Sequence, residues 1–153
     1  MDEETRHPTR RRAAVAACAA VALSLLAAGV RAATLDAADE RAVGAVVRAQ
    51  LEALAADDAV RAYGFATPAI RALFRDPQTF LGMVKSGYAA IVRPRSTVFF
   101  KPESGEGDEA ELRLQVVDRD GAAWIAVYRL ERQPDRSWRI AGCALAPSRA
   151  ELT

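Results

Sequence analysis

Two adjacent carboxylates followed by tyrosines form the pattern in this sequence that could support acid–base chemistry. Asp57 and Asp58 precede Tyr63, and Tyr88 follows further along the chain. A carboxylate and a tyrosine can move protons at a substrate without a metal ion. Asp58 with Tyr63 is therefore the first candidate for a catalytic pair, in an isomerase- or hydratase-like reaction. Asp57 and Tyr88 are the alternative carboxylate and tyrosine. Adjacent aspartates more often mark a helix boundary that faces water, so catalysis is the alternative function here.

Aromatic residues of the predicted body offer a second kind of site. A concave face lined by aromatic side chains would receive a small apolar ligand or a partner peptide. The same side chains could equally pack as an ordinary core, which aromatic residues often dominate. The first function predicted from the sequence is accordingly a non-catalytic binding module. Its pocket candidates are Tyr88, Phe99, Trp124, Tyr128 and Trp138.

The body of this sequence lacks the residues that several common kinds of site require. The single histidine, His7, precedes a long apolar run, so the body has no histidine for a catalytic triad or the usual zinc and iron sites. Of the two cysteines, Cys18 lies in that run and Cys143 in the body, as a buried small hydrophobe or a free thiol. We therefore expect no metal and no cofactor. From residue 33 onward, 16 basic residues face 17 acidic ones, so we expect no nucleic-acid partner.

Residues 1–32 have the order of a targeting segment. Arg10, Arg11 and Arg12 precede eighteen uncharged residues, 13–30, and small residues then follow around Ala32. This order predicts either a cleaved signal peptide or an N-terminal membrane anchor that contacts the bilayer through residues 13–30. In both cases the body, 33–153, would be exported across the bacterial inner membrane. It would lie in the periplasm or stay anchored to the inner membrane.

The first half of the body predicts helices. Apolar residues with a period near 3.6 predict one helix over 37–56, and Asp57-Asp58 would cap a second, short one. Thr67-Pro68 and Asp76-Pro77 are typical helix starts, with a capping side chain followed by proline at the first helical position. The last of these helices should run to about Lys85.

The second half predicts strands at 96–101, 109–118, 122–132 and 137–145, with a loop at 102–108. Gly121 suits the tight turn between the second and third strands. Helices followed by strands predict an α+β fold, with the helices on one face of a curved four-strand antiparallel meander that encloses a cone. The strand at 122–132 is apolar on both faces, and its second face predicts a homodimer.

Four blocks of the body carry a resemblance, namely 65–70, 115–118, 128–132 and, as the most specific, 138–143. They resemble a bacterial family of unknown function, domain of unknown function 4864, which is similar to nuclear transport factor 2-like and cystatin-like cone folds. The resemblance implies the helix-then-meander fold and brings no activity with it. Asp135-Arg136 departs from the Asp-Gly expected at the last hairpin turn.

Overall fold

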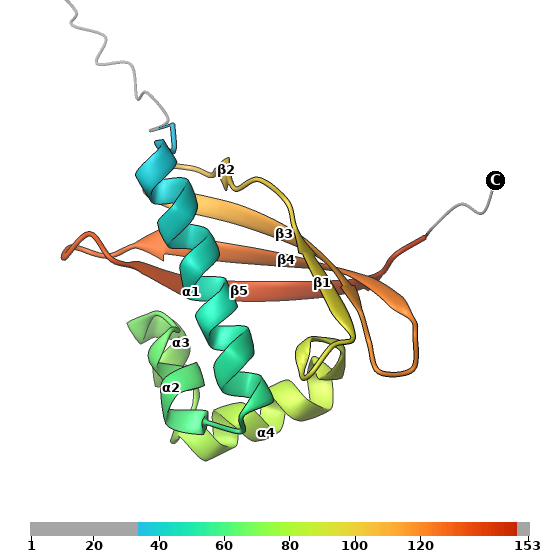
Figure 1. Ribbon diagram of the computed structural model, residues 1–153. Helices are drawn as coiled ribbons and strands as arrows, with labels where there is room; N and C mark the ends of the chain where they lie inside the picture. The colour runs from blue at the N-terminus through green and yellow to red at the C-terminus, as the bar shows by residue number, and fades with distance from the viewer. Residues whose placement is uncertain (1–33, 150–153) are drawn as a thin grey trace, which may run out of the picture. The chain divides into compact units, whose positions relative to one another are not determined.

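The computed structural model describes residues 34–149, which lie in one compact unit of the chain. The predicted targeting segment, 1–32, falls outside the described residues, and its cleavage and the export of the body stay predictions. Helices come first and an antiparallel sheet follows, so the fold is α+β as predicted. Figure 1 shows the helices gathered on one side of the sheet. Among residues 34–149, no helix is both long and apolar enough to cross a bilayer.

The long first helix, α1 (Ala37–Ala55), begins at a capping side chain and continues along a stripe of apolar residues. The Asp36 carboxylate accepts a hydrogen bond from the Asp39 amide at 2.8 Å, and acidic residues fill the first turn. Val43, Val47 and Leu54 recur along one face and are buried. The helix ends at Ala55, one residue before the predicted end.

Three short helices follow, α2 (Ala59–Gly64), α3 (Pro68–Leu73) and α4 (Pro77–Gly87), and each begins at a capping side chain. Asp58, Thr67 and Asp76 accept hydrogen bonds from backbone amides of the first turns. Proline occupies the first turn of α3 and of α4, as the sequence predicts. A 3₁₀ turn, η1 (Ala89–Ile91), was not predicted.

The strands are β1 (Ser96–Phe99), β2 (Glu103–Ser104), β3 (Glu109–Val117), β4 (Ala123–Arg132) and β5 (Trp138–Pro147). They pair antiparallel in the order β1-β3-β4-β5, which is the predicted meander. The short β2 also pairs with β3, where a loop was predicted. Gly121 adopts φ 90° in the turn between β3 and β4, a conformation that glycine takes without steric cost.

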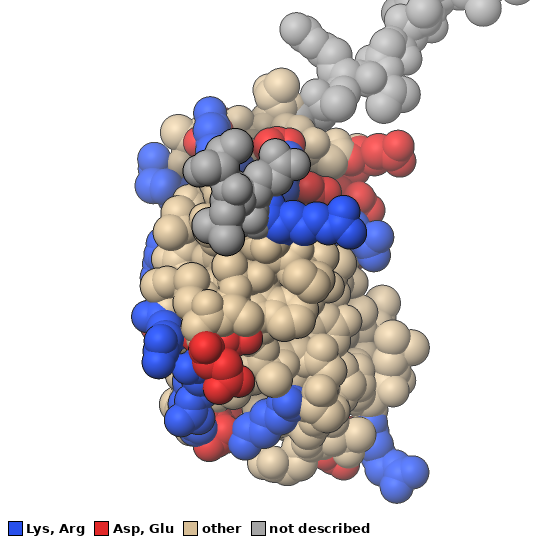
Figure 2. All heavy atoms as spheres, turned by 90° about the vertical axis from the view of Figure 1, so that its right-hand side faces the viewer, with Lys and Arg blue, Asp and Glu red and all other residues tan. Residues whose placement is uncertain are grey.

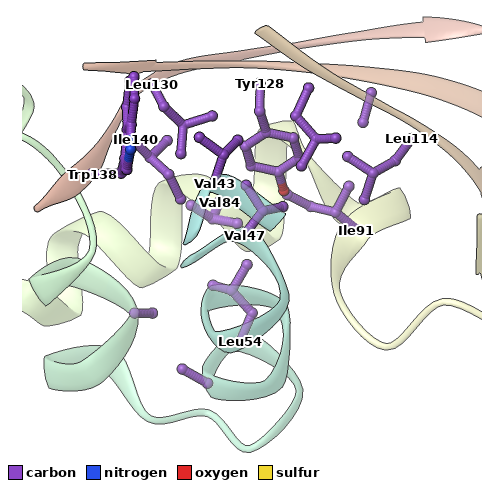
Figure 3. Close-up of a cluster of buried hydrophobic side chains, with 14 of the residues drawn as sticks. Val43, Val47, Leu54, Val84, Ile91, Leu114, Tyr128, Leu130, Trp138 and Ile140 are labelled. Atoms are coloured by element: carbon purple, nitrogen blue, oxygen red, sulfur yellow. The ribbon is translucent and has the colours of Figure 1, made fainter. Parts of the chain in front are cut away.

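The core lies between α1 and the inner face of the sheet. Val43 and Val47 of α1 meet alternate residues of β3 and β4, among them Leu114, Tyr128 and Leu130 (Figure 3). Buried and less buried residues alternate along β3, because successive side chains point to opposite faces of a sheet. This inner face is the one that the helices cover.

The outer face of the sheet is less covered. Ile125 and Val127 of β4 are half-buried there, and Val98 of β1 is 54% exposed. The homodimer through this face stays a prediction.

The junction between α2 and α3 is held against the edge of β5. The Ile140 amide donates to the Phe65 carbonyl at 2.8 Å, and the Thr67 amide donates to the Ile140 carbonyl at 2.9 Å. A parallel bridge between Ala66 and Ile140 results. This contact fixes where α3 begins relative to the sheet.

Candidate functional site

A cavity of about 310 Å³ lies between the helical layer and strands β4 and β5. Its volume is at the lower end of the range for small-molecule sites. Most of its wall is apolar, and Asp, Glu, Lys and Arg are all missing from its lining. The principal apolar residues are Leu54, Ile70, Phe80, Met83, Ile91 and Ile140.

Helix α3 forms the outer wall of this cavity. No residue of α3 is buried. Ile70 and Leu73 in the helix, and Phe74 directly after it, are nevertheless apolar. Leu73 lines the cavity while remaining 75% exposed, so the cavity opens to solvent there. The Phe74 ring packs edge-on against Phe80 of α4, with 5.3 Å between ring centres. The mouth therefore lies at the end of α3, where it meets α4.

Polar atoms enter the wall from the sheet side. Tyr128 of β4 is fully buried, and its hydroxyl has no hydrogen-bond partner among the described residues. Cys143 is its partner in the pairing of β4 with β5 and also lines the cavity. Burial first, and then the neighbouring Cys143 thiol, raise the pKa of the Tyr128 hydroxyl well above its ordinary value. Burial raises the pKa of the Cys143 thiol to about 12. Both groups are therefore neutral at physiological pH.

A buried amide completes the wall from α1. Gln50 is buried, and its Nε2 donates to the Ala62 carbonyl at 3.2 Å. This bond ties α1 to α2 beside the cavity and satisfies one donor of the amide. The site thus combines an apolar wall with three neutral polar side chains, those of Gln50, Tyr128 and Cys143, and with the half-buried Tyr88.

Two of the five predicted pocket residues, Tyr88 and Tyr128, line the cavity. The other three do not, which corrects the expectation of one shared aromatic face. Phe99 lies at a separate hollow between α1 and β1, with the Arg48 guanidinium 4.3 Å from its ring centre.

The two tryptophans are anchored elsewhere by their indole N–H groups. Trp124 Nε1 donates to Asp118 Oδ2 at 2.8 Å, next to the β3–β4 turn. Trp138 Nε1 donates to Asp39 Oδ1 at 3.2 Å, and the Arg132 guanidinium stacks on the Trp138 ring. A buried indole N–H needs an acceptor, and these carboxylates supply it away from the cavity.

The proposed catalytic carboxylates have structural partners. Asp58 is exposed, and its Oδ1 accepts from the Arg61 amide at 3.0 Å as the cap of α2. Asp57 pairs with Lys85 at 2.7 Å and Arg93 at 2.6 Å, and these two cations lower the pKa of its carboxyl. Neither aspartate lines the cavity.

The tyrosine of the catalytic candidate is also engaged. The Tyr63 hydroxyl donates to the Arg71 carbonyl at 2.7 Å, which joins α2 to α3. A donor held in this way supports the fold rather than a substrate. Among residues 34–149, the structure contains no cluster of His, Cys, Asp and Glu suited to a metal ion.

Sequence reasoning missed Gln50 and the cavity-lining position of Cys143. A usable signal for Cys143 was the hairpin register, since Tyr128 and Cys143 pair directly across β4 and β5. No local signal marks Gln50, because a single glutamine on a helix face is ordinary.

Residues 36–153 match a family model described as a domain of unknown function, DUF4864. The chain belongs to this family. A protein of unknown function with a cystatin-like fold from Nostoc punctiforme is similar in structure, with a TM-score of 0.52 and 14% identity over 77% of this chain and 97% of the other. That likeness shows the fold, a cystatin-like α+β arrangement.

Bd1075 of Bdellovibrio bacteriovorus also shows a weaker likeness, with a TM-score of 0.46 and 10% identity over 72% of this chain and 41% of the other. No curated protein matches the chain in sequence.

Proposed function

We propose that this DUF4864 protein is a non-catalytic binding module that holds a small apolar ligand in the cavity between α3, α4 and β5. The observation that carries the proposal is the wall itself, a half-open space of about 310 Å³ without a charged lining residue. Burying apolar ligand surface against such a wall is favourable by roughly 25 cal/mol per Å² before the costs of association.

The enzyme alternative receives less support from the geometry. An acid–base mechanism needs titratable groups within reach of a bound substrate. The carboxylates considered for it, Asp57 and Asp58, serve an ion-pair cluster and a helix cap. Tyr128 and Cys143 of the cavity have raised pKa values, so these two groups do not release protons readily near neutral pH.

The charge distribution favours a small ligand over nucleic acid. On the face in Figure 2, basic and acidic side chains lie beside one another around a broad area free of both. Binding to phosphates would instead use a continuous basic surface. We place the module after export, in the periplasm or on an inner-membrane anchor, on the strength of the targeting pattern in residues 1–32.

Binding can be measured with N-phenylnaphthylamine, a neutral dye whose fluorescence rises when it leaves water. The purified chain should raise the fluorescence saturably, and Ile70→Trp, which fills the cavity from α3, should abolish most of the rise. Val60→Trp is the matched control, since Val60 is 70% exposed on α2 and does not line the cavity.

Met83→Trp, a second filling variant from α4, separates loss of the cavity from loss of folding, with helicity measured by circular dichroism. The proposal fails if both folded filling variants bind the dye as the unchanged chain does.

A further inference from the structure

We propose that the ligand carries a neutral oxygen group, as in an alcohol, a ketone or an ester, and that this oxygen accepts a hydrogen bond from the Tyr128 hydroxyl at the inner end of the cavity. The inference rests on the proposed function and names the ligand class for the same site. Three properties of the cavity lead to it.

The first property is an unused donor. The Tyr128 hydroxyl is completely buried and has no hydrogen-bond partner among residues 34–149. Buried tyrosine hydroxyls are usually paired, because an unpaired buried donor is unfavourable. Figure 3 shows the Tyr128 ring extending from the sheet toward the helices, with its oxygen on the helix side. The Cys143 thiol beside it is only a weak acceptor. Tyr128 borders the cavity, so a bound molecule could supply a stronger one.

The second property is neutrality. The lining includes no cation that could balance a carboxylate or phosphate, and no carboxylate that could balance an amine. An ionised group taken from water into such a wall loses its hydration without a counter-charge, which is strongly unfavourable. A neutral carbonyl or hydroxyl oxygen loses far less, and a hydrogen bond from Tyr128 offsets that loss.

The third property is the direction of the cavity. Its sheet end has the fully buried Tyr128, whereas its α3 end has Leu73, which is 75% exposed. The hydroxyl has no water-accessible surface, so a ligand oxygen reaches it only when a neighbouring side chain, such as that of Cys143, shifts aside. The group that reaches it must therefore be small and must lie at the inner end of the ligand. The apolar part of the ligand then extends past Ile70 and Met83 toward the mouth.

Three probes with one tail and different ends test the assignment: octane, octanol and octanoate. Each is used to displace N-phenylnaphthylamine from the purified chain and from Tyr128→Phe. We expect octanol to bind more tightly than octanoate, and Tyr128→Phe to weaken octanol about three- to tenfold while leaving octane unchanged. Tyr63→Phe is the matched control, since the Tyr63 hydroxyl donates to Arg71 outside the lining and its loss should change none of the three.

The outcomes separate this inference from the proposed function. If the probes displace the dye but octanol binds equally to the unchanged chain and to Tyr128→Phe, the neutral-oxygen assignment is overturned and the apolar cavity stands. Octanoate binding more tightly than octanol would overturn it as well. If neither the dye nor any probe binds, both proposals fail. Thermal melting of each variant shows that the compared chains are folded.

Discussion

At the scale of single residues, two tyrosines of this fold have opposite roles. The Tyr63 hydroxyl donates to the Arg71 carbonyl at 2.7 Å, whereas the buried Tyr128 hydroxyl has no partner among the described residues. A satisfied hydrogen bond contributes about 1 kcal/mol to stability, and an unsatisfied buried group costs about 1–3 kcal/mol. The same substitution should therefore change stability in opposite directions at the two sites.

We expect Tyr128→Phe to raise the free energy of unfolding of the ligand-free chain by about 1 kcal/mol, and Tyr63→Phe to lower it by about 1 kcal/mol. Urea denaturation followed by circular dichroism measures both. A destabilised Tyr128→Phe would show that a partner, such as an enclosed water molecule, already satisfies the hydroxyl.

Cys143 has a thiol rather than a thiolate at neutral pH. Burial raises its pKa to about 12, and the thiolate is the reactive form. At pH 8 we expect iodoacetamide to alkylate Cys143 on the order of a thousandfold more slowly than an ordinary exposed cysteine. Mass spectrometry of the peptide that contains Cys143 gives the rate, with the urea-unfolded chain as control. Rapid alkylation of the folded chain would contradict this environment.

At the scale of elements, Asp39 holds the first turn of α1 against the end of the sheet where β4 finishes and β5 begins. Its carboxylate pairs with the Arg132 guanidinium of β4 and accepts the Trp138 indole N–H of β5. Desolvation raises the pKa of this carboxyl, but the hydrogen bonds from Trp138 and Arg132 outweigh that effect, so the pKa is lowered overall. The carboxylate side chain is 17% exposed, so solvent screens the pair only in part.

Asp39→Asn should lower the free energy of unfolding at neutral pH by about 1–2 kcal/mol, since it removes a charged hydrogen bond. A lowered folded-state pKa means that the stabilisation is complete above the unfolded value near 3.9 and is lost as pH falls through the folded value. The difference between the variant and the unchanged chain should therefore shrink in acid. Asp120→Asn, at an exposed turn residue, is the control and should change little. A difference that stays constant down to pH 2 would exclude the ion pair as its cause.

A variant at Asp58, the cap of α2, tests the proposed binding function against the enzymatic alternative. Asp58→Ala removes the bond to the Arg61 amide and should cost about 1 kcal/mol of stability. Octanol binding should be unchanged, because Asp58 does not line the cavity. A large loss of binding in a fully folded Asp58→Ala chain would return this carboxylate to the functional site.

Short sequence patterns predicted most of the helices and strands. The caps at Asp58, Thr67 and Asp76 start helices where predicted, because capping and proline geometry act within a few residues. The short β2 could not be predicted, because its existence depends on pairing with β3. Its sequence reads as a polar loop between Pro102 and Asp108.

The site was only partly predictable for the same reason. Whether an aromatic residue faces the cavity depends on partners distant in sequence. The Trp138 indole N–H, for example, donates to Asp39, 99 residues earlier in the chain, and Trp138 does not line the cavity. Tyr128 and Tyr88 could be named from their types, but the missing partner of Tyr128 is a property of the packed structure.

At the scale of the whole described unit, the cavity exists because the helical layer is incomplete. Val43 and Val47 of α1 seal one part of the sheet's inner face. Helix α3 has no buried residue, so it stands over β5 without filling the space beneath it. The backbone bridge between Ala66 and Ile140 holds that arrangement in place. The proposed small-molecule site depends on this thin packing of α3 over β5.

Methyl NMR spectra of the purified chain, recorded with and without octanol, test this account most directly. Because binding should occur under α3, we predict saturable shifts of the Ile70, Met83 and Ile140 methyl groups and no shift of Ile125 on the outer sheet face. Shifts confined to Ile125 and its neighbours, or no saturable shifts at all, would contradict a ligand site in this cavity.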